Sequence, residues 1–122
     1  MSKKIETLSF KDINGTPKTL NFVSSTNPKG ITTFELKNEK KRKNTKFFTI
    51  GNLSLRQVTQ FDRFLRKNGF SNLKHLSFKL LCELASVYLN IPKVRVKTPC
   101  RIYYRYSDKV YDLVKALFYF RA

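Results

Sequence analysis

A chain of 122 residues with a formal net charge of +17 and 41% hydrophobic residues is too apolar to be a disordered polycation. Its length fits one domain over residues 1–122, with a β part over about 1–52 and a mainly helical part over about 53–122. It has neither a basic leader before an apolar stretch nor an 18-residue apolar run, which argues against a secretory signal and a membrane span. We expect an intracellular protein, cytoplasmic or, in a eukaryotic host, nuclear.

The N-terminal part predicts an antiparallel sheet of about four strands. Residues 5–10 and 19–23 each place hydrophobic side chains at alternate positions, and the Asn-Gly pair at 14–15 favours a tight reversal between them. A second strand pair is expected over residues 31–37 and 46–50. The expected inward-facing residues are Leu8, Phe10, Leu20, Phe22, Phe34, Leu36, Phe48 and Ile50.

The second half begins with two predicted helices. Ser54 can cap a helix that runs to about Lys67, and the Asn-Gly pair at 68–69 is expected to terminate this helix. The second helix starts at Asn72 or Ser77, ends near Leu89 and is apolar on most sides, so we expect it to be the central core helix. The apolar stripe of the first helix consists of Leu55, Val58, Phe61, Phe64 and Leu65.

A strand-like basic segment follows, and a last helix starts at Ser107. In residues 93–106, cations and one tyrosine alternate with apolar residues, either along one strand or along a hairpin broken at Thr98-Pro99. Alternation at period two predicts that the cations share one face. This predicted face carries Lys93, Arg95, Lys97, Arg101, Tyr103 and Arg105. With it, the order of elements is β-β-β-β-α-α-β-α, which indicates an α+β fold.

Two further cationic groups accompany this segment. A run at a predicted hairpin tip consists of Lys40, Lys41, Arg42 and Lys43, and it could clamp phosphates or act as a nuclear import signal. One face of the first helix carries Arg56, Gln60, Arg63 and Lys67. The charge is not confined to a tail, because residues 1–53 carry 11 Lys or Arg against 4 acids and residues 54–122 carry 14 against 4.

These patterns predict a small, non-catalytic protein that binds DNA or RNA mainly through phosphates, with no cofactor or metal. The segment at 93–105 is its expected main surface, the run at 40–43 a clamp, and Arg56, Arg63 and Lys67 a flank. Tyr103 could stack on an unpaired base. If about six phosphates of duplex DNA are neutralised, log affinity should fall against log salt with a slope of about −5. Residues with A/T-rich codons are abundant, which is typical of phage, viral or mobile-element genomes.

Three alternatives remain open. One is a module that docks on an acidic protein partner as an inhibitor or accessory factor, and another is a ribosomal or RNA-scaffold role. The third is a magnesium-dependent nuclease that uses Asp12 with Glu35-Leu36-Lys37, a pattern that resembles the Asp and Glu-x-Lys arrangement of restriction-type nucleases. That resemblance implies carboxylates that hold Mg²⁺ and a lysine near the attacked phosphate. The acid-x-Lys triplet recurs at residues 39–41, however, so the motif has low specificity in this chain.

Cysteine and histidine usage predicts no nucleophilic or two-histidine chemistry. His75 is the single histidine, and Cys82 and Cys100 lack metal-ligand spacing. We expect both cysteines to be reduced core residues, in surroundings that disfavour a thiolate.

Overall fold

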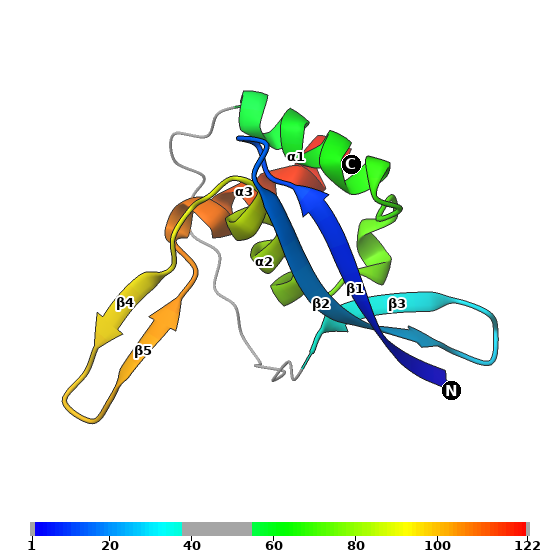
Figure 1. Ribbon diagram of the computed structural model, residues 1–122, viewed down its shortest axis with the longest axis horizontal. Helices are drawn as coiled ribbons and strands as arrows, with labels where there is room; N and C mark the ends of the chain where they lie inside the picture. The colour runs from blue at the N-terminus through cyan, green and yellow to red at the C-terminus, as the bar shows by residue number, and fades with distance from the viewer. Residues whose placement is uncertain (1, 38–54, 122) are drawn as a thin grey trace.

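The computed structural model describes residues 2–37 and 55–121 (Figure 1). It is an α+β fold, as the sequence predicts, with two antiparallel sheets and three α-helices in the described residues. In chain order the elements are β1 (Ser2–Lys11), β2 (Pro17–Thr26), β3 (Thr32–Leu36), α1 (Leu55–Lys67), the 3-10 helix η1 (Leu73–His75), α2 (Phe78–Tyr88), β4 (Val94–Lys97), β5 (Ile102–Arg105) and α3 (Asp108–Arg121).

The first sheet has the strand order β1-β2-β3 and confirms the expected N-terminal hairpin. Asp12 shapes its turn, because one carboxylate oxygen accepts the N–H groups of Asn14 and Thr16, each at 2.9 Å. Gly15 has a φ of +82°, a conformation that a residue without Cβ adopts readily. The expected fourth strand at 46–50 lies outside the described residues.

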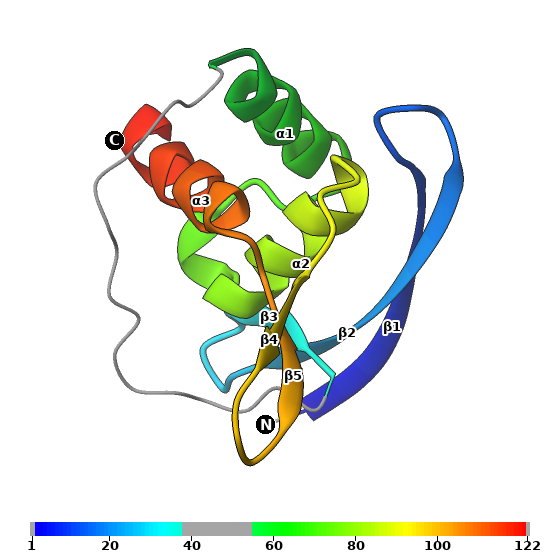
Figure 2. The same ribbon diagram turned by 90° about the vertical axis from the view of Figure 1, so that its left-hand side faces the viewer.

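The helices pack on one side of this curved sheet, and α2 lies between the sheet and the other two helices (Figure 2). Leu80, Leu81 and Leu84 of α2 are fully buried, which confirms its predicted place at the centre of the core. Burial of one such leucine stabilises the fold by about 1.5–3 kcal/mol. The core also includes Leu20, Phe22, Val58, Phe61, Phe64, Leu65, Val110, Leu113, Val114 and Leu117.

Local signals begin and end helices where the sequence predicts. The Ser77 hydroxyl caps α2 by accepting the Leu80 N–H, and Ser107 does the same for Val110 in α3. Gly69, with a φ of +86°, follows the end of α1. One expected core residue is wrong: Leu55, the first residue of α1, is 73% exposed.

Candidate nucleic-acid interface

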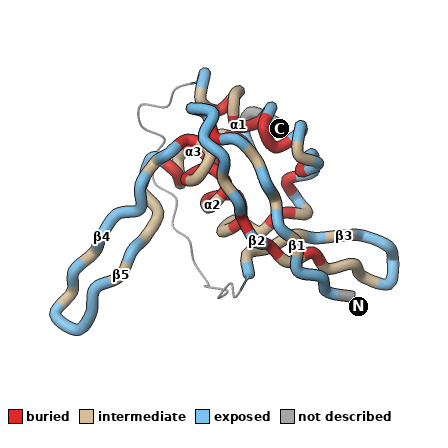
Figure 3. Tube along the Cα trace, viewed as in Figure 1, coloured by how far each residue is buried: buried red, intermediate tan, exposed pale blue. Residues whose placement is uncertain are grey.

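The basic segment forms a hairpin that projects away from the helices (Figure 1). Strands β4 and β5 have four residues each and, among the described strands, pair only with each other. Both faces meet solvent: every residue of the two strands is exposed or half-buried (Figure 3), and Tyr104 retains 65% of its surface. A two-stranded ribbon of this kind is narrow enough to enter a major groove.

The hairpin register separates the cations that the alternation pattern assigns to one face. Directly opposed residues point to the same face. Because four residues form the turn between β4 and β5, each odd-numbered residue of β4 opposes an even-numbered residue of β5. The prediction of a single cationic face is therefore wrong. One face carries Arg95, Lys97, Ile102 and Tyr104, and the other carries Val94, Val96, Tyr103 and Arg105.

Carboxylates neutralise two of the predicted contact residues at the root of the hairpin. Lys93 Nζ lies 3.3 Å from a Glu83 oxygen and 5.0 Å from the centre of the Tyr106 ring. The Tyr106 hydroxyl donates a hydrogen bond to the same Glu83 oxygen. Burial, which is the larger cause, and this hydrogen bond both raise the pKa of Tyr106. On the other strand, Arg105 donates to Asp108 at 2.9 Å. Lys93 and Arg105 therefore anchor the hairpin to α2 and α3.

The tip of the hairpin is a four-residue turn with its own hydrogen bonds. The Thr98 hydroxyl donates to the Arg101 carbonyl at 3.0 Å and accepts the Arg101 N–H at 3.1 Å. The Arg101 guanidinium lies 5.0 Å from the centre of the Tyr103 ring, within the range of a cation–π contact. Cys100 is exposed in this turn, so the expectation that it is a core residue is wrong.

Three hairpin cations stay available to a partner. Arg95, Lys97 and Arg101 are exposed, and no carboxylate of the described residues pairs with them. Arg95 and Lys97 share their face with the exposed side chains of Tyr104 and Ile102. This face combines positive charge with apolar and aromatic surface. The run Lys40, Lys41, Arg42 and Lys43 lies outside the described residues.

The predicted cations of α1 do not flank the hairpin. Arg56, Arg63 and Lys67 are exposed as expected, but α1 lies at the end of the molecule opposite the hairpin tip in Figure 2. Arg63 and Lys67 instead border a hollow of about 450 Å³ between α1 and the end of β1. Gln60, predicted on the same face of α1, also lines it, whereas sequence reasoning missed its other members. It is lined by Ser9, Phe10, Lys11, Gln60, Arg63, Phe64, Lys67, Asn68 and Tyr88.

The residues proposed for a nuclease lie apart. Glu35 pairs with Val23, whose β1 partner is Ile5, seven residues before Asp12. At about 3.3 Å per residue, Asp12 lies about 23 Å further along the strand direction than the position that pairs with Glu35 across the sheet. No group of three His, Cys, Asp or Glu residues in the described part of the chain is arranged to hold a metal ion.

The carboxylate of Asp12 is already occupied. Burial alone would raise the pKa of Asp12, but the Thr16 N–H, the Asn90 side chain, the Asn14 N–H and Lys18 together lower it. Cys82 is buried, and this burial strongly raises the pKa of its thiol, as the sequence predicts. These two groups therefore serve the fold, Asp12 as a turn former and Cys82 as a small apolar side chain.

Comparison with protein-family models, curated proteins and solved structures found no match to this chain. No helix in the described ranges combines the length and the apolar character needed to cross a bilayer.

Proposed function

We propose that this protein binds nucleic acid, without catalysis, through the projecting hairpin β4–β5. The observation that carries the proposal is the set of three exposed cations, Arg95, Lys97 and Arg101, which pair with no carboxylate of the described residues and lie on a ribbon that projects from the helices. A polyanion with regularly spaced phosphates complements such a ribbon, because each contact releases a condensed counterion. An intracellular location, where DNA and RNA are the abundant polyanions, belongs to the same proposal.

The positions of the available cations set the expected mode of binding. Arg95 and Lys97 share one face of the ribbon, and Arg101 lies in the turn at its tip. Arg105, the strand cation of the other face, is paired with Asp108. A ribbon with available cations on one face and at its tip suits contact of that face with one phosphate backbone while the tip enters a groove. Its anchored root supports this mode, because Glu83 and Asp108 hold the two strands where they leave the body.

The first experiment is purification from cells without nuclease treatment. We expect nucleic acid to co-elute with the wild-type protein, and its digestion by DNase or RNase identifies it. Arg95→Glu, Lys97→Glu and Arg101→Glu together should abolish co-elution. The matched control reverses the charge of three other lysines by substituting glutamate for Lys3, Lys4 and Lys29, which are also exposed. These lysines lie near the N-terminus and in the β2–β3 turn, on the opposite side of the molecule from the hairpin (Figure 1).

The two triple variants have the same net charge, so they separate a hairpin effect from a general charge effect. Equal loss of nucleic acid in both would overturn the hairpin assignment. Retention in the hairpin variant, with an unchanged circular dichroism spectrum, would move the interface to other residues.

An acidic protein partner is a second candidate function. It is favoured by the exposed side chains of Tyr104 and Ile102 beside Arg95 and Lys97, because aromatic residues and arginine are enriched in protein interfaces. This candidate predicts a stoichiometric complex with one protein that survives nuclease digestion. Loss of that complex in Tyr104→Ala, with no co-eluting nucleic acid in the wild type, would support it over the first proposal.

A further inference from the structure

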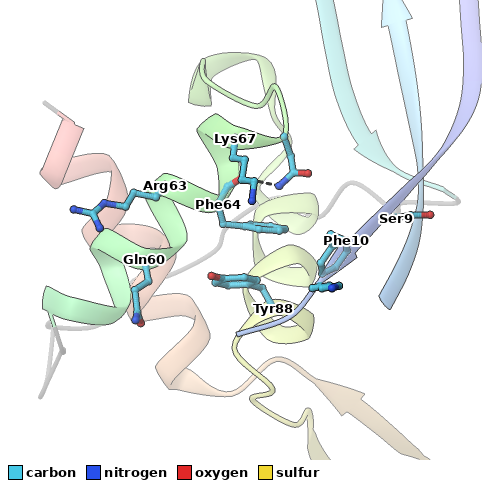
Figure 4. Close-up of a pocket in the computed structure, with 9 residues that line it drawn as sticks. Ser9, Phe10, Gln60, Arg63, Phe64, Lys67 and Tyr88 are labelled. Carbon is cyan, nitrogen blue, oxygen red and sulfur yellow. Dashed lines mark hydrogen bonds between the residues drawn. The ribbon is translucent and has the colours of Figure 1, made fainter. Parts of the chain in front are cut away.

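The hollow between α1 and the end of β1 combines an aromatic interior with a cationic rim (Figure 4). Its volume of about 450 Å³ lies in the range of small-ligand sites. Three elements build it: the end of β1 supplies Phe10 and Lys11, α1 supplies Phe64 and its cations, and the end of α2 supplies Tyr88. These elements are distant in sequence, so only the fold creates the site.

Three rings form the interior. The Phe64 and Tyr88 rings are stacked with centroids 4.2 Å apart and an interplanar angle of 19°. Phe10 meets Phe64 edge to face at 5.1 Å. Phe64 is 6% exposed and forms the floor, whereas Phe10 and Tyr88 are half-buried and keep accessible surface. An incoming planar ring can therefore extend an aromatic arrangement that is already in place.

The rim supplies positive charge and amide groups. Lys11, Arg63 and Lys67 are exposed, and no carboxylate is among the residues that line the hollow. Arg63 and Lys67 extend outward from α1 in Figure 4. The Asn68 amide donates to the Phe64 carbonyl at 2.8 Å, which fixes its orientation and leaves its oxygen as an acceptor. The Gln60 amide supplies both a donor and an acceptor.

We propose that this hollow binds one unpaired nucleobase, with the adjoining phosphates held by Lys11, Arg63 and Lys67. The inference rests on the proposed function, because it assigns the hollow to a single-stranded part of the nucleic acid that the hairpin contacts. Stacking on aromatic side chains combined with a cationic track for the backbone is the usual way in which proteins hold single strands. A base inside a duplex is stacked and paired, so only an unpaired base can enter.

The test compares two 20-nucleotide single strands, oligothymidine and a strand of the same length with abasic sites in place of the bases. Both carry the same phosphates, so their affinity ratio isolates the contribution of the bases. We expect the wild-type protein to bind oligothymidine about 5- to 150-fold more tightly, the range that stacking of one base provides. Tyr88→Leu should reduce this ratio toward one, and Tyr88→Phe should preserve it.

Tyr104→Leu is the matched control, because it removes an exposed aromatic side chain from the hairpin instead of the hollow. If Tyr104→Leu lowers the ratio and Tyr88→Leu does not, the base is bound at the hairpin and the inference is wrong. If Tyr88→Leu fails to fold in a thermal melt, the double variant Ser9→Glu with Lys67→Glu replaces it, since both positions are exposed. That variant should also lose the preference for oligothymidine.

The outcomes separate the two proposals. Equal affinity of the wild-type protein for both strands, with weakening by the hairpin variants, overturns the base site and supports the hairpin. No binding of either strand overturns the base site, and it overturns the hairpin proposal as well only if duplex DNA and RNA also fail to bind. A ratio that depends on Tyr88, together with weaker binding by the hairpin variants, supports both.

Discussion

The salt dependence of binding gives the sharpest test of which cations contact phosphate. If Arg95, Lys97 and Arg101 act with the three cations at the rim of the hollow, about six phosphates are neutralised. On a single strand each contributes about −0.7 to the slope of log affinity against log salt, which gives a slope of about −4. Between 50 and 200 mM salt, the affinity of the wild-type protein should then fall about 300-fold.

Two double variants with equal charge change test this reasoning. Arg95→Ala with Lys97→Ala removes two unpaired cations and should flatten the slope by about 1.4, so that the same salt increase weakens binding only about 50-fold. Lys93→Ala with Arg105→Ala removes two cations that Glu83 and Asp108 already neutralise. It should flatten the slope by less than about 0.7.

Fluorescence anisotropy of a labelled 20-nucleotide strand, titrated at four salt concentrations, measures both slopes. A thermal melt of each variant checks that the hairpin anchors can be removed without unfolding. Equal flattening by the two double variants would refute the reasoning, because affinity would then follow total charge and not the exposed hairpin cations.

Three further predictions concern the fold that positions the site. Tyr106→Phe removes the hydrogen bond to Glu83 and should lower the free energy of unfolding, measured in urea, by about 1.5–3 kcal/mol. A loss under about 0.5 kcal/mol would contradict a role of this hydrogen bond in anchoring the hairpin to α2. Asp12 has a lowered pKa in the native state, so its contribution to stability is present above the unfolded pKa of about 3.9 and is lost as pH falls through the native pKa. Asp12→Asn should therefore be less stable than the wild type at neutral pH, with a gap that closes in acid, and a gap independent of pH would count against the turn assignment. In the native protein a thiol reagent should modify Cys100 quickly and Cys82 only after denaturant is added, because burial raises the pKa of Cys82 and blocks access of the reagent. Similar rates of modification for the two cysteines would show that Cys82 of α2 is not buried in the core.

Much of the fold was predictable because its signals are local. The Asn-Gly turn at 14–15, the Ser77 and Ser107 caps and the stop at Gly69 each act within a few residues, and all lie where the sequence places them. The apolar character of 78–89 was enough to predict the central helix. Leu55 was misplaced because helical periodicity continues to the first turn of a helix, whereas burial also requires a neighbouring element there.

The candidate site was only partly predictable. The sequence identified the hairpin cations, and the structure leaves Arg95, Lys97 and Arg101 exposed. It could not assign them to faces, because the parity of an antiparallel pair depends on how many residues the turn contains. Nor did it indicate the hollow, because Phe10, Phe64 and Tyr88 belong to three elements that only long-range packing brings together.

By itself, the amino-acid sequence determined the sign and abundance of charge, the α+β class and the local signals that start or stop several elements, since these depend on side-chain type and on neighbours along the chain. Tertiary structure decided that Lys93 is paired, because the fold brings it to Glu83 of α2, whereas Arg105 pairs with Asp108 only three residues further along the chain. It also decided where aromatic rings and cations meet. The hollow draws them from β1, α1 and α2, which are far apart in the sequence, so no local pattern predicts their contact.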